Sequence, residues 1–229
     1  MPAGEYPESD GKPMAETGIH VDCMTDLFKM LRGFFLMAPD VYVGANMFLY
    51  YQEGDPRKVV APDVFVVLGV SSRDERNTWK VWVEGKAPDV IFELTSKSTR
   101  KEDLVEKKGL YERLGVREYF LFDPQREYLQ PSLWGYRLAG KEYVRLEGEV
   151  LQSEVLGLVL RVEEGQLRLY DRATGGRILT PIEEMEARQI AEVRAEQAEV
   201  RAEQETVARQ EVEAELERLK AELERLRRR

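Results

Sequence analysis

Two acidic residues stand inside the two most apolar segments of the chain, where acidic side chains are unusual. Asp63 lies within VVAPDVFVV and Glu93 within DVIFELTS, and both have apolar neighbours on either side. Burying an ionised carboxylate is costly unless the group is paired or binds a metal ion. Two such carboxylates on adjacent strands are suited to one hard cation, and oxygen ligands with partial hydration favour Mg²⁺ or Mn²⁺.

A basic side chain follows these carboxylates at helical spacing. Asp103, Lys107 and Tyr111 are four residues apart, which places them on one face of a helix. We therefore expect Lys107 to reach the carboxylates as a charge stabiliser or proton relay. The combination predicts metal-assisted attack of water on a phosphodiester, in which the cation generates hydroxide and neutralises developing charge.

A purely structural interpretation of the same residues is also open. In this alternative Asp63, which follows Pro62, caps a turn or a bulge. Glu93 then forms a salt bridge with Lys107 inside the fold and has no chemical role. The spacing alone does not choose between the two interpretations.

Residue counts exclude several other chemistries. A single cysteine, Cys23, excludes an intramolecular disulfide framework and a cysteine-cluster zinc site. A single histidine, His20, excludes a two-histidine metal site, and its place at a helix start is typical of a structural hydrogen bonder. The glycine spacings match neither the dinucleotide nor the triphosphate motif. The polar residues from Ser96 to Thr99 are typical of a helix-capping connector.

The site residues need a sheet and a covering helix to bring them together. Hydrophobic periodicity predicts helices over 20–37 and 101–114, and strands over 41–51, 59–70, 78–83, 89–95 and 116–122. Short antiparallel strands are predicted within 134–138, 142–146 and 158–170. This order indicates an α/β protein with a mixed α+β sheet, and not a doubly wound nucleotide-binding fold.

The length and composition divide the chain into two parts. At roughly 150 residues per domain, 229 residues allow one core domain plus an appendage. We predict a domain over 1–180 and a charged helix over 182–229. The second part has no glycine or proline and carries 14 acidic and 10 basic residues, a net charge of −4.

Heptad repeats in the second part predict a coiled coil that makes the protein a homodimer. AEVRAEQ occurs twice from Ala191, and AELERL occurs twice from Ala214. The valine and leucine sets differ in phase, so a break or stutter is expected near residues 207–212. A solvated single helix held by Glu–Arg pairs is the alternative, mainly for the valine part. The apolar seam consists of Ile190, Val193, Val200, Val207, Leu216, Leu219, Leu223 and Leu226.

The net charge of −9, from 43 acidic and 34 basic residues, argues against a broad basic surface that coats nucleic acid. No segment approaches the ~18 consecutive apolar residues of a membrane span, and the first residues do not form a signal peptide. We therefore expect a cytoplasmic protein without a membrane partner.

The order of the motifs resembles the Uma-type restriction endonuclease family of the PD-(D/E)XK nuclease superfamily. The resemblance covers most of residues 5–180. It is carried by APDVFVV (61–67), APDVIFELTSKST (87–99), the Asp103–Lys107–Tyr111 spacing and GVREYFLFDP (115–124). It implies a restriction-endonuclease-like core that acts on DNA, with Asp63 and Glu93 as ligands of Mg²⁺ or Mn²⁺.

One position departs from the superfamily pattern. The superfamily's lysine stands two residues after the acidic ligand, and this position is Thr95 here. The family pattern offers Lys107 from the following helix instead, with Lys97 and Lys108 as weaker substitutes. A further acidic ligand near the N-terminus is common in the superfamily, and Glu16 and Asp26 are both candidates.

The alternative function is a weak or inactive nuclease-fold module that binds DNA or assembles through its C-terminal helix. Thr95 in the lysine position and the lack of a basic patch favour this alternative. The intact Asp63 and Glu93 favour the nuclease.

Overall fold

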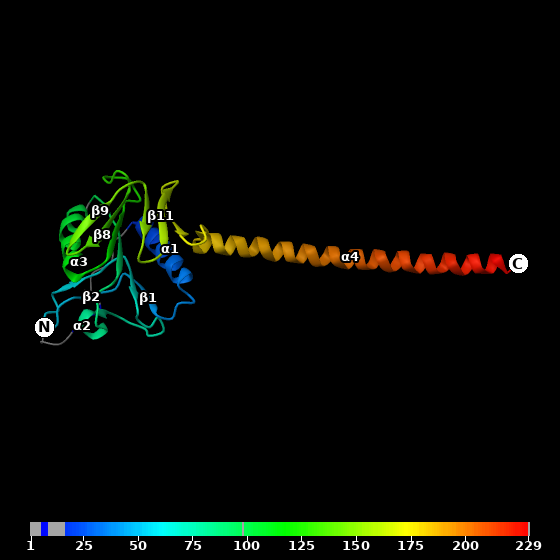
Figure 1. Ribbon diagram of the computed structural model, residues 1–229, viewed down its shortest axis with the longest axis horizontal. Helices are drawn as coiled ribbons and strands as arrows, with labels where there is room; N and C mark the ends of the chain where they lie inside the picture. The colour runs from blue at the N-terminus through cyan, green and yellow to red at the C-terminus, as the bar shows by residue number, and fades with distance from the viewer. Residues whose placement is uncertain (1–5, 9–16, 98, 229) are drawn as a thin grey trace. The chain divides into compact units, whose positions relative to one another are not determined.

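The computed structural model describes residues 6–8, 17–97 and 99–228. It divides into two compact units, Met1–Pro181 and Ile182–Arg229 (Figure 1). The first is built around β-sheets and the second is a helix.

The first unit is organised around a six-stranded sheet. Its strand order is β1-β4-β6-β7-β8-β9. The pair β6–β7 is parallel and the other pairs are antiparallel. A parallel pair needs a crossover connection, and here a π-helix, η1 (Glu102–Lys107), continues directly into α3 (Lys108–Leu114). The strands are β1 (Val41–Ala45), β4 (Val64–Leu68), β6 (Val90–Leu94), β7 (Glu118–Phe122), β8 (Leu133–Ala139) and β9 (Glu142–Leu146).

One face of this sheet packs against α1 (Gly18–Phe34) and a second sheet. The second sheet has four strands: β10 (Val150–Ser153), β11 (Leu158–Glu163), β12 (Gln166–Asp171) and β13 (Arg177–Ile178). Successive side chains of a strand point to opposite faces, so Phe92 and Leu94 of β6 join this apolar cluster together with Leu27 and Leu31 of α1.

The opposite face carries the crossover helix and a small three-stranded sheet. The small sheet consists of β3 (Val59–Val60), β2 (Leu49–Tyr50) and β5 (Trp79–Lys80), and the short helix α2 (Val81–Glu84) follows it. Ile91 of β6 points to this face, where it packs with Phe65, Tyr111 and Tyr119. Glu93 is two residues after Ile91 on the same strand, so it points to the same face.

Two predicted strands are each divided between two sheets. The segment 41–51 forms β1 and β2, and Asn46 between them has a φ of 47° that interrupts an extended strand. The segment 59–70 forms β3 and β4. Pro62 lies between these two strands, and proline has no backbone N–H to donate to a sheet.

The predicted strand over 78–83 is wrong after its first residues. Only Trp79 and Lys80 pair with β2, because β2 itself is two residues long. The chain then forms α2, which ends at Gly85 with a φ of 78°. Trp79 is fully buried and its indole N–H donates to the carbonyl of Lys86 at 3.0 Å, which closes this turn.

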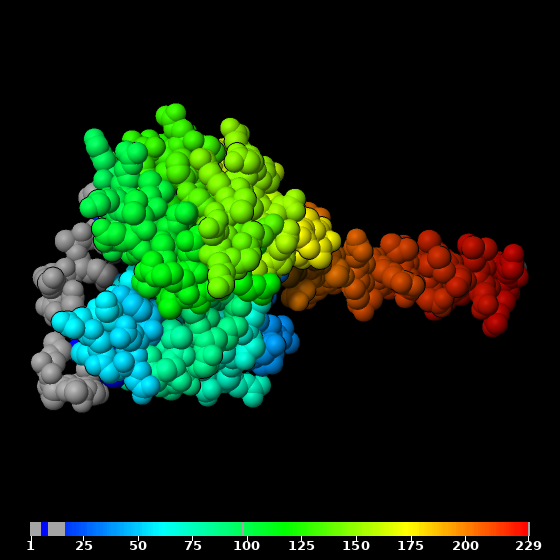
Figure 2. Space-filling view, turned by 60° about the vertical axis from the view of Figure 1, so that its left-hand side comes forward, coloured from blue at the N-terminus to red at the C-terminus, as the bar shows by residue number. Residues whose placement is uncertain are grey.

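The second unit consists of one helix, α4 (Pro181–Arg227), of 47 residues. The predicted break near 207–212 is not present, because the helix is continuous there, and a stutter of the heptad phase stays a prediction. Figure 2 shows this helix with all its side chains in space-filling form. The apolar seam is open to solvent in the single chain, with exposed fractions from 48% at Leu216 to 65% at Leu226. Within the described part of the chain, no helix is both long and apolar enough to cross a lipid bilayer.

Candidate active site

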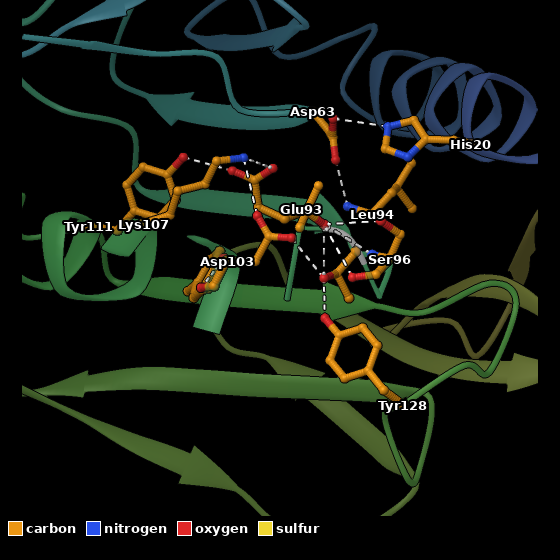
Figure 3. A network of polar contacts seen from close by, with 12 residues as sticks. His20, Asp63, Glu93, Leu94, Ser96, Asp103, Lys107, Tyr111 and Tyr128 are labelled. Carbon is orange, nitrogen blue, oxygen red and sulfur yellow. Dashed lines mark hydrogen bonds and ion pairs between the residues drawn. The ribbon is translucent and has the colours of Figure 1, made fainter. Parts of the chain in front are cut away.

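Asp63 follows Pro62 at the bend between β3 and β4, and this bend places Asp63 beside β6. The backbone N–H of Asn46 donates to the carbonyls of Pro62 and Asp63 at 3.1 and 3.0 Å, which holds this bend. Val64, the first residue of β4, pairs with Phe92 of β6 in antiparallel register, and Asp63 directly precedes Val64. The Asp63 side chain is buried, and its Oδ2 accepts the backbone N–H of Leu94 at 2.6 Å (Figure 3). Asp63 and Glu93 therefore enter the site from adjacent strands.

His20 contacts the other oxygen of Asp63. Thr17 caps the start of α1 by accepting the backbone N–H of His20 at 3.3 Å, which sets His20 in the first turn. The Nε2 atom of His20 lies 3.2 Å from Asp63 Oδ1. Sequence reasoning assigned His20 a structural role and did not place it at the site. The two residues are 43 positions apart, and only the packing of α1 against the sheet brings them together.

Glu93 is the most enclosed acidic group of the site. Its side chain is 1% exposed and receives a partner at each oxygen. Lys107 Nζ lies 3.0 Å from Oε2, and the Tyr111 hydroxyl donates to Oε1 at 2.7 Å (Figure 3). The predicted helical face therefore points at Glu93, with Lys107 at the end of η1 and Tyr111 in α3.

A third buried carboxylate, Asp103, completes the surroundings of the lysine. Asp103 Oδ1 lies 3.3 Å from Lys107 Nζ, and its Oδ2 accepts the Thr95 hydroxyl at 2.7 Å. Thr95 also contacts the hydroxyl of Tyr128. Sequence reasoning missed Tyr128. Its position depends on a turn in which Asp123 Oδ2 accepts the backbone N–H groups of Tyr128 and Leu129, at 2.9 and 3.1 Å.

The electrostatics of the site are dominated by negative charge in a buried region. Burial raises the pKa of the Glu93 carboxyl, and the nearby Asp63 and Asp103 raise it further against the opposing effect of Lys107. Burial lowers the pKa of Lys107, but Glu93 and Asp103 outweigh burial and the pKa is raised. Burial also raises the pKa of Tyr111, so its hydroxyl stays a hydrogen-bond donor at neutral pH.

Lys97 and Lys108, the weaker lysine candidates from the sequence, make other contacts. The Lys97 side chain is exposed, and its backbone N–H donates to Glu127 at 2.9 Å. The Lys108 ammonium lies 4.8 Å from the ring centre of Tyr136. Asp26 of α1 lines a cavity of about 220 Å³ on the Leu94 face of β6, opposite to the face of Glu93. Glu16 lies outside the described residues.

The structure bears on both interpretations of the acidic pair. The Glu93–Lys107 salt bridge of the structural interpretation is present, and it is equally expected of a nuclease site. The Asp63 side chain does not only cap its own bend, because it reaches across to the backbone of β6. Among residues 6–8, 17–97 and 99–228, no three His, Cys, Asp or Glu side chains are arranged to hold a metal ion.

Comparison with known proteins gives a family assignment. No curated protein matches the chain. One similar solved structure is a crystal structure of "a putative nuclease belonging to DUF820" from Anabaena variabilis, with 14% identity and a TM-score of 0.46. The match covers 63% of this chain and 76% of that chain. The family model "Uma2: Putative restriction endonuclease" matches residues 3–169.

The matched range contains Asp63, Glu93, Asp103 and Lys107, and it includes every strand of the central sheet. The predicted fold class is confirmed: a mixed α+β restriction-endonuclease-like unit followed by a long charged helix. The chain belongs to the Uma2 family.

Proposed function

We propose that the protein is a divalent-metal-dependent endonuclease that hydrolyses phosphodiester bonds in DNA. One observation carries the proposal: Asp63, directly before β4, accepts the backbone N–H of Leu94 beside Glu93 on β6, and Lys107 Nζ lies 3.0 Å from Glu93. These are two acidic groups and one basic group, buried together at the end of a strand. Family membership supports the same reaction class.

The charges of the site fit a divalent cation. Three buried acidic residues, Asp63, Glu93 and Asp103, line the site, and Lys107 is a basic group paired with two of them. Mg²⁺ commonly takes only one or two protein carboxylates and completes its coordination with water and substrate phosphate. A pair of carboxylates is therefore sufficient, and we assign Asp63 and Glu93 as the ligands of Mg²⁺ or Mn²⁺.

When bound, the cation supplies acidification of a water molecule and neutralisation of phosphate charge. Lys107 contributes a fixed positive charge beside the same position, where it stabilises negative charge that develops on the phosphate. Tyr111 keeps the Glu93 carboxylate oriented through its 2.7 Å hydrogen bond. Lys97 and Arg100 are exposed on the connector that follows β6, and their charges suit the phosphate backbone of the substrate.

The test is plasmid cleavage in the presence of Mg²⁺ or Mn²⁺. We expect Asp63→Asn, Glu93→Gln and Lys107→Ala each to lower the rate by about 100-fold or more, the effect typical of losing one essential electrostatic group. Asp74→Asn is the matched control, because Asp74 is 69% exposed. Equal residual nicking by the wild type and all variants would refute the nuclease.

The second candidate function is a non-cleaving module that binds DNA or assembles. Two contacts favour it: the Lys107 ammonium is already engaged by Glu93 and Asp103. Under this function DNA binding persists without cleavage and is unaffected by Asp63→Asn. The same set of variants, tested for DNA binding by a gel-shift assay, separates the two functions.

We also propose that the protein forms a homodimer through α4. The seam residues of this helix are about half exposed, from Leu216 at 48% to Leu226 at 65%. A second helix would cover them in a coiled coil. A dimer carries two sites, which suits cleavage of both strands of a two-fold symmetric duplex. We expect the protein to act in the cytoplasm.

A further inference from the structure

Thr95 occupies the position at which the superfamily has its lysine, and its hydroxyl contacts Asp103, a partner of the lysine that replaces it. Thr95 directly follows β6, two residues after Glu93, and is 2% exposed. Its backbone N–H donates to the carbonyl of Phe122 at 2.8 Å, which continues the pairing of β6 with β7. Its hydroxyl donates to Asp103 Oδ2 at 2.7 Å.

Asp103 links this hydroxyl to Lys107. It is 2% exposed, and its second oxygen, Oδ1, lies 3.3 Å from Lys107 Nζ. The backbone carbonyl of Asp103 accepts the Tyr119 hydroxyl at 3.0 Å, so the start of η1 is tied to β7 as well. The Lys107 ammonium is therefore held from two sides, by Glu93 on the strand and by Asp103 on its own helix.

A lysine needs such support when it comes from a helix. Its side chain has four rotatable bonds, and fixing a long, flexible side chain costs conformational entropy. In the proposed site, Glu93 also binds the cation. Asp103 supplies a second contact with the Lys107 ammonium, and Thr95 fixes the rotamer of Asp103 through a hydrogen bond in a buried region.

The helix itself is unusual at this point. Residues Glu102–Lys107 form a π-helix before α3 begins at Lys108. Single π-turns are rare and occur frequently at functional sites. Here the π-helix contains both Asp103 and Lys107, the two residues whose side chains form the ion pair.

We propose that Thr95 and Asp103 are positioning residues that hold the Lys107 ammonium for phosphodiester cleavage, with the Thr95 hydroxyl as the anchor on the strand. This inference rests on the proposed function. Thr95 does not contact the substrate and acts through Asp103 and Lys107. On this account, Thr95, at the position where the superfamily has its lysine, helps to hold Lys107, the lysine that the following helix supplies instead.

The experiment is a double-mutant cycle with Thr95→Val and Lys107→Ala, measured by steady-state cleavage of plasmid DNA with Mn²⁺. Thr95→Val removes the hydroxyl at nearly constant volume. We expect it to lower kcat by about tenfold to 100-fold, as small misplacements of catalytic groups do, with KM unchanged. Thr95→Ser, which keeps the hydroxyl, is expected to restore kcat to within about threefold of the wild type.

The cycle distinguishes positioning from a structural role. If Thr95 acts through Lys107, adding Thr95→Val to Lys107→Ala lowers kcat no further. A structural role predicts that the two losses multiply, and that result would overturn the inference. Thermal unfolding of all variants checks that each one is folded at the assay temperature.

A second measurement does not depend on cleavage. The protein is treated with an acylating reagent, and the modification of Lys107 is measured by mass spectrometry with Lys108 as the internal reference. Lys108 packs against Tyr136 and has no contact with Asp103 in the described structure. We expect Thr95→Val, but not Thr95→Ser, to increase the labelling of Lys107 relative to Lys108.

The two readouts separate the inference from the proposed function. If no variant cleaves DNA but Thr95→Val exposes Lys107, the nuclease proposal fails and the anchoring of Lys107 by Thr95 stands. If the wild type cleaves DNA and Thr95→Val leaves both kcat and Lys107 labelling unchanged, the inference fails and the nuclease proposal stands.

Discussion

The carboxyl group of Glu93 shows how individual contacts set the chemistry of the site. It is 1% exposed, and burial raises its pKa. Hydrogen bonds that favour the charged form act against this effect. The Tyr111 hydroxyl at 2.7 Å is one of them, and the Lys107 ammonium at 3.0 Å is the other charge-stabilising contact. Tyr111 is thus expected to matter both for stability and for the availability of the carboxylate.

Tyr111→Phe tests this expectation. The substitution leaves one oxygen of a buried carboxyl without its donor, and we expect the free energy of unfolding to fall by about 1–3 kcal/mol. Urea denaturation followed by circular dichroism measures the change. Tyr136→Phe is the matched control, because Tyr136 belongs to the same apolar cluster and packs against Tyr119 and Tyr143. An equal effect of both substitutions would contradict a specific role for the Tyr111 hydroxyl.

At the scale of elements, the central sheet depends on close packing between neighbouring strands. Gly44 of β1 is paired with Phe65 of β4. A Cβ atom at residue 44 would lie 2.4 Å from the ζ-carbon of the Phe65 ring, too close for unstrained contact. The absence of a side chain at Gly44 therefore leaves room for the Phe65 ring beside Trp79. The centres of the Phe65 and Trp79 rings are 5.7 Å apart, in an edge-to-face arrangement. Asp63 directly precedes β4, so this packing also supports the site.

Gly44→Ala is predicted to destabilise the protein through overpacking. Forcing an extra methyl group into a filled core typically costs about 1–3 kcal/mol, and we expect a loss of this size in urea denaturation. Gly18→Ala at the start of α1 is the control, because a Cβ there meets no atom within 4 Å. Gly18→Ala should leave the free energy of unfolding unchanged or raise it, since alanine favours helices. A loss equal to that of Gly44→Ala would refute the packing argument.

At the scale of the whole molecule, the distribution of charge matters more than its sum. The helix 182–229 carries −4 of the total −9. Part of the remaining acidity consists of the buried carboxylates of the candidate site, which a bound cation would offset locally. The total charge is therefore weak evidence against a DNA partner.

The proposed homodimer gives a prediction at the same scale. We expect the full chain to be a dimer in sedimentation equilibrium and a chain ending at Pro181 to be a monomer. Leu219→Glu should weaken the dimer, because Leu219 is a seam residue and 53% exposed in the single chain. Ala221→Glu adds the same charge outside the seam and should leave the dimer intact. An unchanged oligomer after truncation would remove the proposed role of α4.

Several features could be predicted from the sequence because they depend on local patterns. Asp63 and Glu93 stood out because ionised groups are costly in apolar strands. The spacing of Asp103, Lys107 and Tyr111 predicted one helical face, and Lys107 and Tyr111 both reach Glu93. The long helix followed from a segment without glycine or proline. Each of these signals is contained within a few residues of sequence.

Other features were decided only by the tertiary structure, because they depend on contacts between distant segments. β2 and β3 leave the main sheet, since Asn46 and Pro62 interrupt strands whose composition is otherwise continuous. The contact of His20 with Asp63 needs α1 to pack against the sheet. Composition and spacing alone determine that acidic groups are buried beside a lysine. Which partners each oxygen of those groups receives depends on how the strands and helices pack, because a hydrogen bond forms only where the fold brings donor and acceptor within about 3 Å.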